Sequence, residues 1–149
     1  MGDIKLCRMD IDDIPEIMVI ENLSFAVPWS AESFITEVQN NRAARYVVAK
    51  DTDKVIGYGG MWIILDESHI TNIAVHPDYR GKGIGNLILK AMIEMAKQEN
   101  IIAMTLEVRR TNYIAQRLYE KYGFVSVGIR PKYYEDNNED AIIMWKNNV

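Results

Sequence analysis

The sequence predicts an α/β fold, a mixed sheet flanked by helices, and three observations lead to this prediction. Segments that alternate apolar and polar residues, as strands do, are interleaved with segments that repeat apolar residues at helical spacing. Hydrophobic residues make up 48% of the 149 residues and charged residues 26%, which is ordinary for a globular protein. No proline-rich linker, internal repeat or low-complexity tract interrupts the sequence, so we expect residues 1–149 to form a single domain.

The first half of the chain predicts one strand, two helices and a three-stranded meander. Residues 4–9 alternate in polarity like a half-buried strand. A helix follows, because Asp12 or Asp13 can cap its first turn and Pro15 suits that turn. The remaining elements of this half are a short helix from Ser30 to Asn40–Asn41 and strands at residues 45–49, 55–65 and 69–75.

Three glycines lie inside the expected strand at residues 55–65. Gly57, Gly59 and Gly60 would weaken an ordinary strand, because they offer no side chain to pack. They therefore predict either a bulge or a place where another group approaches the backbone closely.

The second half of the chain predicts two helices that alternate with strands. The helix that begins at Ile84 is strongly amphipathic, and the helix that ends near Tyr122 has Gly123 at the position of a C-cap glycine. The strand at residues 101–108 is mostly apolar and is therefore expected inside the sheet. Two last strands are expected at residues 124–128 and 141–145, with a polar loop at 135–140 between them. The apolar stripe of the first helix consists of Ile84, Leu87, Ile88, Ala91, Met92, Met95 and Ala96.

Charge, hydropathy and cysteine content argue against several classes of protein. The 17 basic and 21 acidic residues give a net charge of −4, whereas dedicated nucleic-acid binders usually present a basic face, so we expect no direct nucleic-acid binding. The longest uncharged apolar stretch, Val55–Leu65, is too short for a membrane helix. The first residues lack the apolar core of a signal peptide, so a cytoplasmic protein is expected. Cys7 is the only cysteine, so we expect no internal disulfide, no metal site and a small core residue at this position.

Residues Pro77–Gly85 form a glycine-rich loop that runs directly into the helix beginning at Ile84. Alternating glycines let backbone N–H groups converge on an anion, and the positive end of the helix dipole adds to the attraction. Arg80 and Lys82 supply countercharge. The spacing fits neither a Walker A loop nor a dinucleotide-binding fingerprint. By itself, the loop is therefore either a phosphate cradle or an ordinary flexible turn into a helix.

The run Arg80–Gly85 reads R-x-x-G-x-G, and it follows a strand that ends in Asn72–Pro77. This combination, with the order of elements along the whole chain, resembles the acetyl-CoA-binding signature of the GCN5-related N-acetyltransferase (GNAT) superfamily. The resemblance implies a mostly antiparallel sheet, acetyl-CoA as co-substrate, loop amides on the CoA pyrophosphate and strand backbone on the pantetheine arm. The implied CoA contacts are Ile73, Ala74, Val75, Arg80, Gly81, Lys82, Gly83, Ile84, Gly85, Asn86 and Asn112.

Further segments resemble one bacterial branch of this superfamily. Members of that branch acetylate the N-terminal α-amine of a small-subunit ribosomal protein, so the resemblance implies such a protein as the acceptor. Thr111 departs slightly from the branch, where a small residue such as serine is common. The matching segments are Phe25–Ser30, Asn72–Val75, Leu106–Arg109, Asn112, Leu118–Tyr119, Gly123–Phe124, Tyr133–Tyr134 and Glu139–Met144.

Two side chains, Glu107 and Tyr119, are candidates for the proton transfers that acetylation of an amine requires. Glu107 lies in an apolar strand, where burial would raise its pKa toward neutrality, although a solvated strand face is the alternative. Tyr119 lies on the apolar stripe of its helix, and by position alone it is a packed core aromatic. The resemblance implies that Glu107 is the general base and that Tyr119 protonates the CoA thiolate. A backbone N–H near Ala74–Val75 is expected to polarise the thioester carbonyl.

The acceptor is expected across the sheet from CoA. Trp29, Tyr133 and Tyr134 are candidates for the walls of a narrow slot that receives an N-terminus, and ordinary packing is the alternative. The acidic stretch at residues 135–140 is either a solvated hairpin tip or an attraction for a basic ribosomal tail.

The residues favour direct transfer within a ternary complex, without an acyl-enzyme. Cys7 is far in sequence from the glycine loop, and His69 and His76 have no carboxylate or nucleophile at motif spacing, so structural roles are expected for all three. Two alternatives remain for the function. One keeps the chemistry but acts on a small-molecule amine or a lysine side chain, and the other is a CoA-binding module without catalysis. The presence of both Glu107 and Tyr119 argues against the module.

Overall fold

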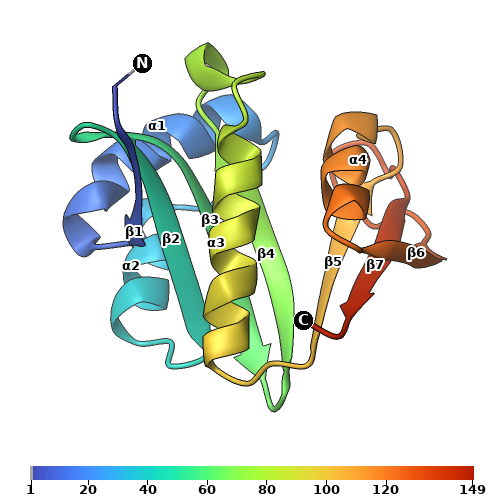
Figure 1. Ribbon diagram of the computed structural model, residues 1–149. Helices are drawn as coiled ribbons and strands as arrows, with labels where there is room; N and C mark the ends of the chain where they lie inside the picture. The colour runs from blue at the N-terminus through green and yellow to red at the C-terminus, as the bar shows by residue number, and fades with distance from the viewer. Residues whose placement is uncertain (1) are drawn as a thin grey trace.

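Seven strands form one sheet in the computed structural model, which describes residues 2–149 (Figure 1). The strands are β1 (Ile4–Arg8), β2 (Ala44–Asp51), β3 (Lys54–Ile64), β4 (Glu67–Val75), β5 (Ala103–Arg109), β6 (Val125–Arg130) and β7 (Ala141–Asn147). Their order across the sheet is β1-β2-β3-β4-β5-β7-β6, and only the β4–β5 pair is parallel. The expected α/β fold with a mixed, mostly antiparallel sheet is confirmed.

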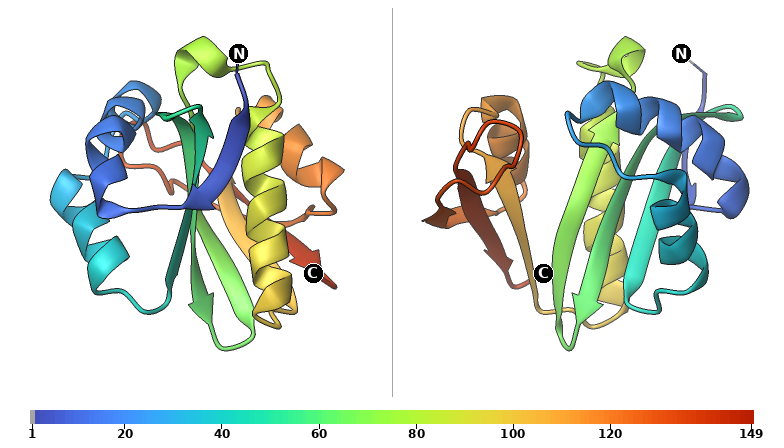
Figure 2. Two further views of the ribbon diagram at one scale, coloured as in Figure 1. Left: turned by 60° about the vertical axis from the view of Figure 1, so that its left-hand side comes forward. Right: turned by 180° about the vertical axis from the view of Figure 1, so that it is seen from behind.

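Helices cover both faces of the sheet, as Figures 1 and 2 show. One face carries α1 (Ile14–Ser24) and α2 (Ala31–Gln39), and the other carries α3 (Ile84–Gln98) and α4 (Tyr113–Lys121). Short 3-10 turns precede α1 (η1, Ile11–Asp13) and α3 (η2, Pro77–Tyr79). Within residues 2–149, no helix is both long enough and apolar enough to cross a membrane.

The first two helices begin near the predicted residues, but only one of them has a side-chain cap. The Ser30 hydroxyl accepts a hydrogen bond from the Ser33 N–H at 3.1 Å, so it caps α2 as predicted. The Asp13 carboxylate does not cap α1. It accepts the Asp10 N–H at 2.8 Å and pairs with Lys50 Nζ at 2.9 Å, because the chain enters α1 through the turn η1.

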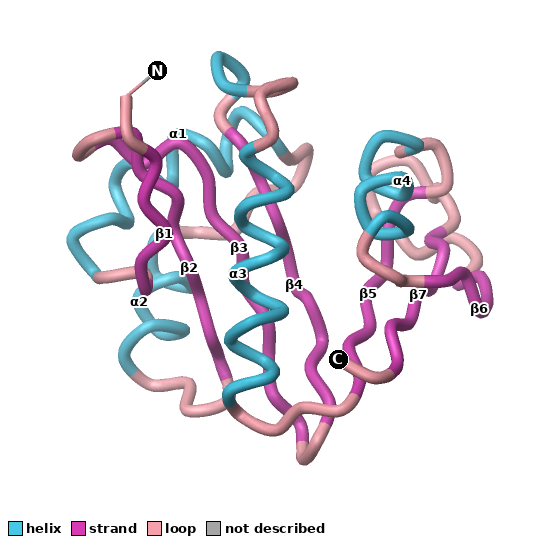
Figure 3. The backbone as a smooth tube through the Cα atoms, viewed as in Figure 1, coloured by secondary structure: helices cyan, strands magenta, loops and turns pink. Residues whose placement is uncertain are grey.

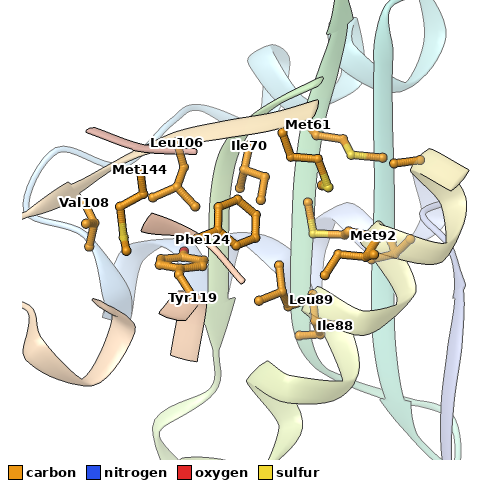
Figure 4. Packing of buried hydrophobic residues seen from close by; sticks show 14 of the residues in the cluster. Met61, Ile70, Ile88, Leu89, Met92, Leu106, Val108, Tyr119, Phe124 and Met144 are labelled. Carbon is orange, nitrogen blue, oxygen red and sulfur yellow. The ribbon is translucent and has the colours of Figure 1, made fainter. Parts of the chain in front are cut away.

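Each face of the sheet has its own hydrophobic core. The core under α3 and α4 is shown in Figure 4, where Ile88 and Met92 of α3 pack toward the strands. Leu87 was expected in the apolar stripe of this helix, yet it is 40% exposed, while Leu89 and Ile93 are buried. The buried face is centred on Ile88 and Met92, which leaves Leu87 beyond one edge of it. The core under α1 and α2 includes Ile17, Ile20, Phe34, Tyr46, Val48 and Tyr58.

The glycines of β3 allow both a bulge and a close approach of another element, the two possibilities that the sequence suggested. The β3–β4 register shifts between Gly60 and Met61, which is a bulge. A Cβ on Gly59 would lie 2.6 Å from Met92 Sδ, so α3 approaches the strand closely here. The ring of Tyr46 lies over Gly60 on the opposite face.

Cys7 is exposed on β1, at the edge of the sheet, so the expectation of a core cysteine is wrong. Ile4 and Leu6 pack toward the core of one face, whereas Lys5 and Cys7 alternate with them and are exposed, because β1 lies at the edge of the sheet. Among the described residues, no three His, Cys, Asp or Glu side chains gather as metal ligands do.

Candidate active site

The strands β4 and β5 separate soon after they meet, and a cleft opens between them. Only three residue pairs join them, the last being His69 with Thr105. Figures 1 and 3 show the two strands meeting at one end and diverging toward the other. The cleft has a volume of about 990 Å³. Because the sheet is interrupted here, side chains from both of its faces line the same cleft.

Glu107 of β5 lines this cleft on the side of α1 and α2. Its neighbours Leu106 and Val108 lie in the core of the opposite face, as alternation predicts. Both carboxylate oxygens lie 3.0 Å from His69 Nε2, and Oε1 accepts a hydrogen bond from the Tyr133 hydroxyl at 3.2 Å. The hydrogen bond from His69 lowers the pKa of Glu107, although burial opposes it. The expected rise in this pKa is therefore wrong, because the groups that bury the carboxylate also donate to it.

His69 is the member of this cluster that sequence reasoning missed. The two residues are 38 positions apart, so no motif spacing connects them. They meet because β4 and β5 are parallel and in a register that places His69 opposite Thr105, two residues before Glu107 on the same face. His69 was expected to have a structural role because no carboxylate lies at motif spacing, and its carboxylate partner comes from a distant strand instead. His76 also has an acidic neighbour: its Nδ1 lies 3.8 Å from Asp78 Oδ2 and accepts the Asp78 backbone N–H at 3.1 Å.

Tyr119 reaches the cleft from the other face of the sheet. It lies on α4, is 8% exposed, and packs its ring edge-on against Phe124 at a centroid distance of 5.7 Å (Figure 4). Burial raises the pKa of its hydroxyl above the ordinary value for tyrosine. The hydroxyl therefore carries its proton at neutral pH. The packing expected for Tyr119 is confirmed, and its role as an acid stays a prediction.

The glycine loop follows the end of β4, at the end of the sheet where β4 and β5 are apart (Figure 1). Gly81 and Gly83 have φ values of +77° and +81°, and nothing lies within 4 Å of the position that a Cβ would occupy on either residue. Gly83 is also the N-cap of α3. Arg80 Nε donates to the Val75 carbonyl at 3.0 Å, which fixes the loop to the end of β4. An open backbone cradle at a helix N-terminus suits an anion such as a diphosphate.

The remaining residues predicted to contact CoA lie on β4, α3 and at the start of α4. The segment Ile73–Val75 pairs with β3 on one edge, and within residues 2–149 no strand pairs with its other edge. Asn112 lines the cleft, and its Oδ1 accepts the Ala115 N–H at 3.1 Å, so it is the predicted N-cap of α4. Asn86 Oδ1 accepts a hydrogen bond from Lys121 Nζ at 3.0 Å, which ties α4 to the first turn of α3.

The three aromatic residues predicted for the acceptor slot all line the cleft. The backbone N–H of Trp29 donates to the buried carboxylate of Glu21 at 2.8 Å. The rings of Tyr133 and Tyr134 are perpendicular at 5.1 Å, and the Arg109 guanidinium stacks 4.0 Å from the Tyr134 ring centroid. Burial raises the pKa of Tyr134 to about 12. The three aromatic residues thus line the same cleft as Glu107, and their role as walls of the acceptor slot stays a prediction.

Arginine side chains hold the acidic loop between β6 and β7. Arg109 contacts Asp136 at 2.9 Å and Glu139 at 3.2 Å, and Arg110 contacts Asp140 at 3.5 Å. Residues 135–138 are exposed, which agrees with a solvated hairpin tip. Most of the negative charge that could attract a basic tail is already paired with arginine.

A sequence model of the "Acetyltransferase (GNAT) family" matches residues 14–124, which is most of the chain. A Bacillus subtilis protein named as a candidate ribosomal protein bS18-alanine N-acetyltransferase is 42% identical over 138 residues, which cover 93% of this chain and 91% of that protein.

Solved structures show the same similarity in three dimensions. The crystal structure of the ribosomal-protein-S18-alanine N-acetyltransferase from Escherichia coli superposes with a TM-score of 0.89 at 31% identity, over 98% of this chain and 94% of that chain. The PaiA N-acetyltransferase of Thermoplasma acidophilum, solved in complex with coenzyme A, has a TM-score of 0.76 at 22% identity, over 97% of this chain and 99% of that chain. At that identity the likeness concerns the fold alone.

Proposed function

The chain belongs to the acetyltransferase (GNAT) family, and we propose that it transfers the acetyl group of acetyl-CoA to the N-terminal α-amine of a ribosomal protein. One observation carries the proposal. The splay between β4 and β5 brings Glu107 and Tyr119 into one cleft from opposite faces of the sheet. The relatives described above support the acceptor, because their names specify an alanine of ribosomal protein S18.

In this proposal, the glycine loop binds the diphosphate of acetyl-CoA. The open positions beside Gly81 and Gly83, the N-terminus of α3 and the charges of Arg80 and Lys82 support this placement. The free edge of Ile73–Val75 would hold the pantetheine arm through backbone hydrogen bonds. The thioester then lies in the cleft between the two candidate catalytic side chains.

The acceptor amine attacks the thioester carbonyl carbon directly. As the N–C bond forms, the amine proton passes to Glu107, directly or through water, and a backbone N–H near Ala74–Val75 stabilises the oxyanion. When the C–S bond breaks, the CoA thiolate takes the proton of Tyr119. No acyl-enzyme is required, since Cys7 lies exposed on β1 at the far edge of the sheet.

The pKa values of these groups suit an α-amine better than a lysine. An α-amine has a pKa of about 7.8, against about 10.4 for lysine, so a useful fraction is already neutral at neutral pH. Glu107 has a lowered pKa and is a weak base, so it serves best as an ionised hydrogen-bond acceptor for an amine that loses its proton easily. Trp29 and Tyr133 would enclose the first residue of the acceptor on its two sides.

The test is an assay of CoA thiol release. Purified protein with acetyl-CoA is presented with peptides that begin with alanine, serine or methionine and, separately, with polyamines and other small amines. We expect thiol release with the alanine-initiated peptide. Turnover of a small amine, with none of any peptide, would overturn the proposal.

A further inference from the structure

Negative charge on the two walls of the cleft is held in different ways. On the wall formed by the β6–β7 loop, Asp136, Glu139 and Asp140 are paired with Arg109 and Arg110. On the side of α1 and α2, the carboxylates of Glu21 and Glu37 are 2% and 8% exposed, and within residues 2–149 their hydrogen-bond partners are neutral donors. Apart from Glu135, the carboxylates without a cationic partner in and beside this cleft therefore lie on the side of α1 and α2 among the described residues.

Glu37 is the clearest example of a carboxylate that is held by neutral donors alone. Its carboxylate accepts hydrogen bonds from Trp62 Nε1 at 2.5 Å, Tyr46 OH at 2.9 Å and Asn41 Nδ2 at 2.6 Å. Among the described residues, no lysine, arginine or histidine nitrogen lies within 4.0 Å of it. Three neutral donors fix the carboxylate in place without neutralising it, so a cation brought nearby would be attracted.

A groove leads from the cleft to this carboxylate. It runs beside α2, has a volume of about 460 Å³, and is lined by Trp29, Trp62, Glu32, Thr36 and Glu37 among others. We refer to it as the α2 groove. Trp29 and Trp62 line both the α2 groove and the cleft, so the two spaces adjoin at these two residues.

The sheet register shows how the α2 groove relates to the candidate base. Trp62 of β3 is directly opposite His69 of β4, and residues opposite each other in an antiparallel pair share a face. His69 in turn contacts Glu107. A single row, Glu107–His69–Trp62–Glu37, therefore crosses the sheet under α1 and α2. From β5 to β3 is about 10 Å, which an extended peptide covers in about three residues.

We propose that the acceptor polypeptide continues from the cleft over Trp29 and Trp62 into the α2 groove, and that this groove selects a cationic side chain at residue 2, 3 or 4 of the acceptor. The inference rests on the proposed function. Two properties of the groove favour a cation: it is lined by two tryptophans, whose indole rings attract cations, and within residues 2–149 the carboxylates of Glu32 and Glu37 have no cationic partner. Ribosomal proteins fit this occupant, because binding to RNA phosphates requires lysine and arginine.

The first experiment needs no variant of the enzyme. Alanine-initiated peptides carry arginine or its neutral isostere citrulline at position 2, 3 or 4, and kcat/KM is measured for each at low and high salt. We expect the arginine peptide to be better by roughly tenfold at one of these positions, with the ratio falling at high salt. Ratios within about twofold of one at all three positions would overturn the inference. The proposed function fails differently, since then no peptide is acetylated at all.

Matched variants show which carboxylate selects the cationic side chain of the acceptor. Glu32→Gln changes an exposed residue of the α2 groove and Glu37→Gln a buried one, and each should reduce the arginine-to-citrulline ratio while leaving kcat/KM for the citrulline peptide nearly unchanged. Glu135→Gln makes the same charge change on the opposite wall and should leave the ratio unaltered. Should Glu135→Gln abolish the ratio while Glu32→Gln preserves it, the selection belongs to the β6–β7 loop and the inference is wrong. Glu32 keeps the test valid if Glu37→Gln fails to fold.

Discussion

The two sides of the cleft present different kinds of candidate binding group. On the side of the glycine loop, the candidate binding groups are backbone N–H groups, presented by Gly81, Gly83 and the first turn of α3. On the acceptor side, they are side chains from separate elements, such as Glu107, His69 and Tyr133, which hold one another by hydrogen bonds. The first kind of site is encoded locally, and the second depends on which strands are neighbours.

This difference also predicts which kinetic constant a substitution on each side changes. A change in the glycine loop alters the shape of a surface that should bind acetyl-CoA, so its effect is expected in KM. A change on the acceptor side removes a group that meets the reacting atoms or positions one that does, so its effect is expected in kcat or in its dependence on pH. The following variants test this division, beginning with the largest expected effect.

Glu107→Gln should lower kcat by about 10²–10⁴-fold, because an amide cannot accept the proton of the acceptor amine. KM for acetyl-CoA should change little, since Glu107 lies away from the glycine loop. Steady-state kinetics with an alanine-initiated peptide measure both. Glu94→Gln, the same change on the exposed surface of α3, is the control. Full kcat in Glu107→Gln at neutral pH would exclude this residue as the base.

Tyr119→Phe should lower kcat by about 10–100-fold, less than the loss of the base, because a thiolate is already a good leaving group. Phenylalanine keeps the edge-on contact with Phe124, so the melting temperature should remain close to that of the wild type. Kinetics and thermal unfolding are measured on the same preparation. An equal loss of kcat in the neighbouring variant Tyr122→Phe would show that the effect is not specific to Tyr119.

Gly83→Ala should raise KM for acetyl-CoA by roughly tenfold, because a left-handed conformation costs a non-glycine residue about 1–2 kcal/mol and the new methyl group enters the anion cradle. Gly128→Ala is the matched control. Gly128 lies in β6, away from the glycine loop, and its Cβ would make only an ordinary contact, 3.7 Å from Ile143 Cδ1. Titration of CoA binding by calorimetry checks both variants. Equal affinity in Gly83→Ala and the wild type would argue against the loop as the diphosphate site.

His69→Ala should move the acidic limb of the kcat profile to higher pH. The hydrogen bond from His69 lowers the pKa of Glu107, so its removal leaves burial to raise that pKa. Activity that needs ionised Glu107 is present above its pKa and is lost as the pH falls through it, so the variant should lose activity first on the acidic side. His69→Gln keeps a donor to the carboxylate and should restore part of the profile. An unchanged acidic limb in His69→Ala would mean that the contact has no influence on the base.

Much of the fold could be predicted because its signals are local. The alternation of β1, the Ser30 cap, the amphipathic α3 and Gly123 after α4 each involve neighbouring residues, and the structure agrees with each in outline. The wrong predictions concern residues whose burial or contacts depend on elements distant in the sequence. Cys7 fits the expected strand, yet its exposure follows from the position of β1 at the sheet edge.

In the candidate site, too, features encoded locally could be predicted and features that depend on distant strands could not. Both Glu107 and the glycine loop could be identified from the sequence and from its resemblance to a family. The pKa of Glu107 could not be predicted, because its sign depends on a hydrogen bond from His69, which comes from a different strand. The paired arginines of the acidic loop and the neutral donors of Glu37 likewise became visible only with the fold.

The central claim is that this cleft acetylates an N-terminal α-amine. It is tested most directly with one peptide that begins with alanine and contains an internal lysine, incubated with acetyl-CoA and the enzyme. Fragmentation in a mass spectrometer then locates the acetyl group. We expect a single acetyl group on the α-amine with the wild type and almost none with Glu107→Gln. Acetylation of the lysine, or of neither amine, would contradict it.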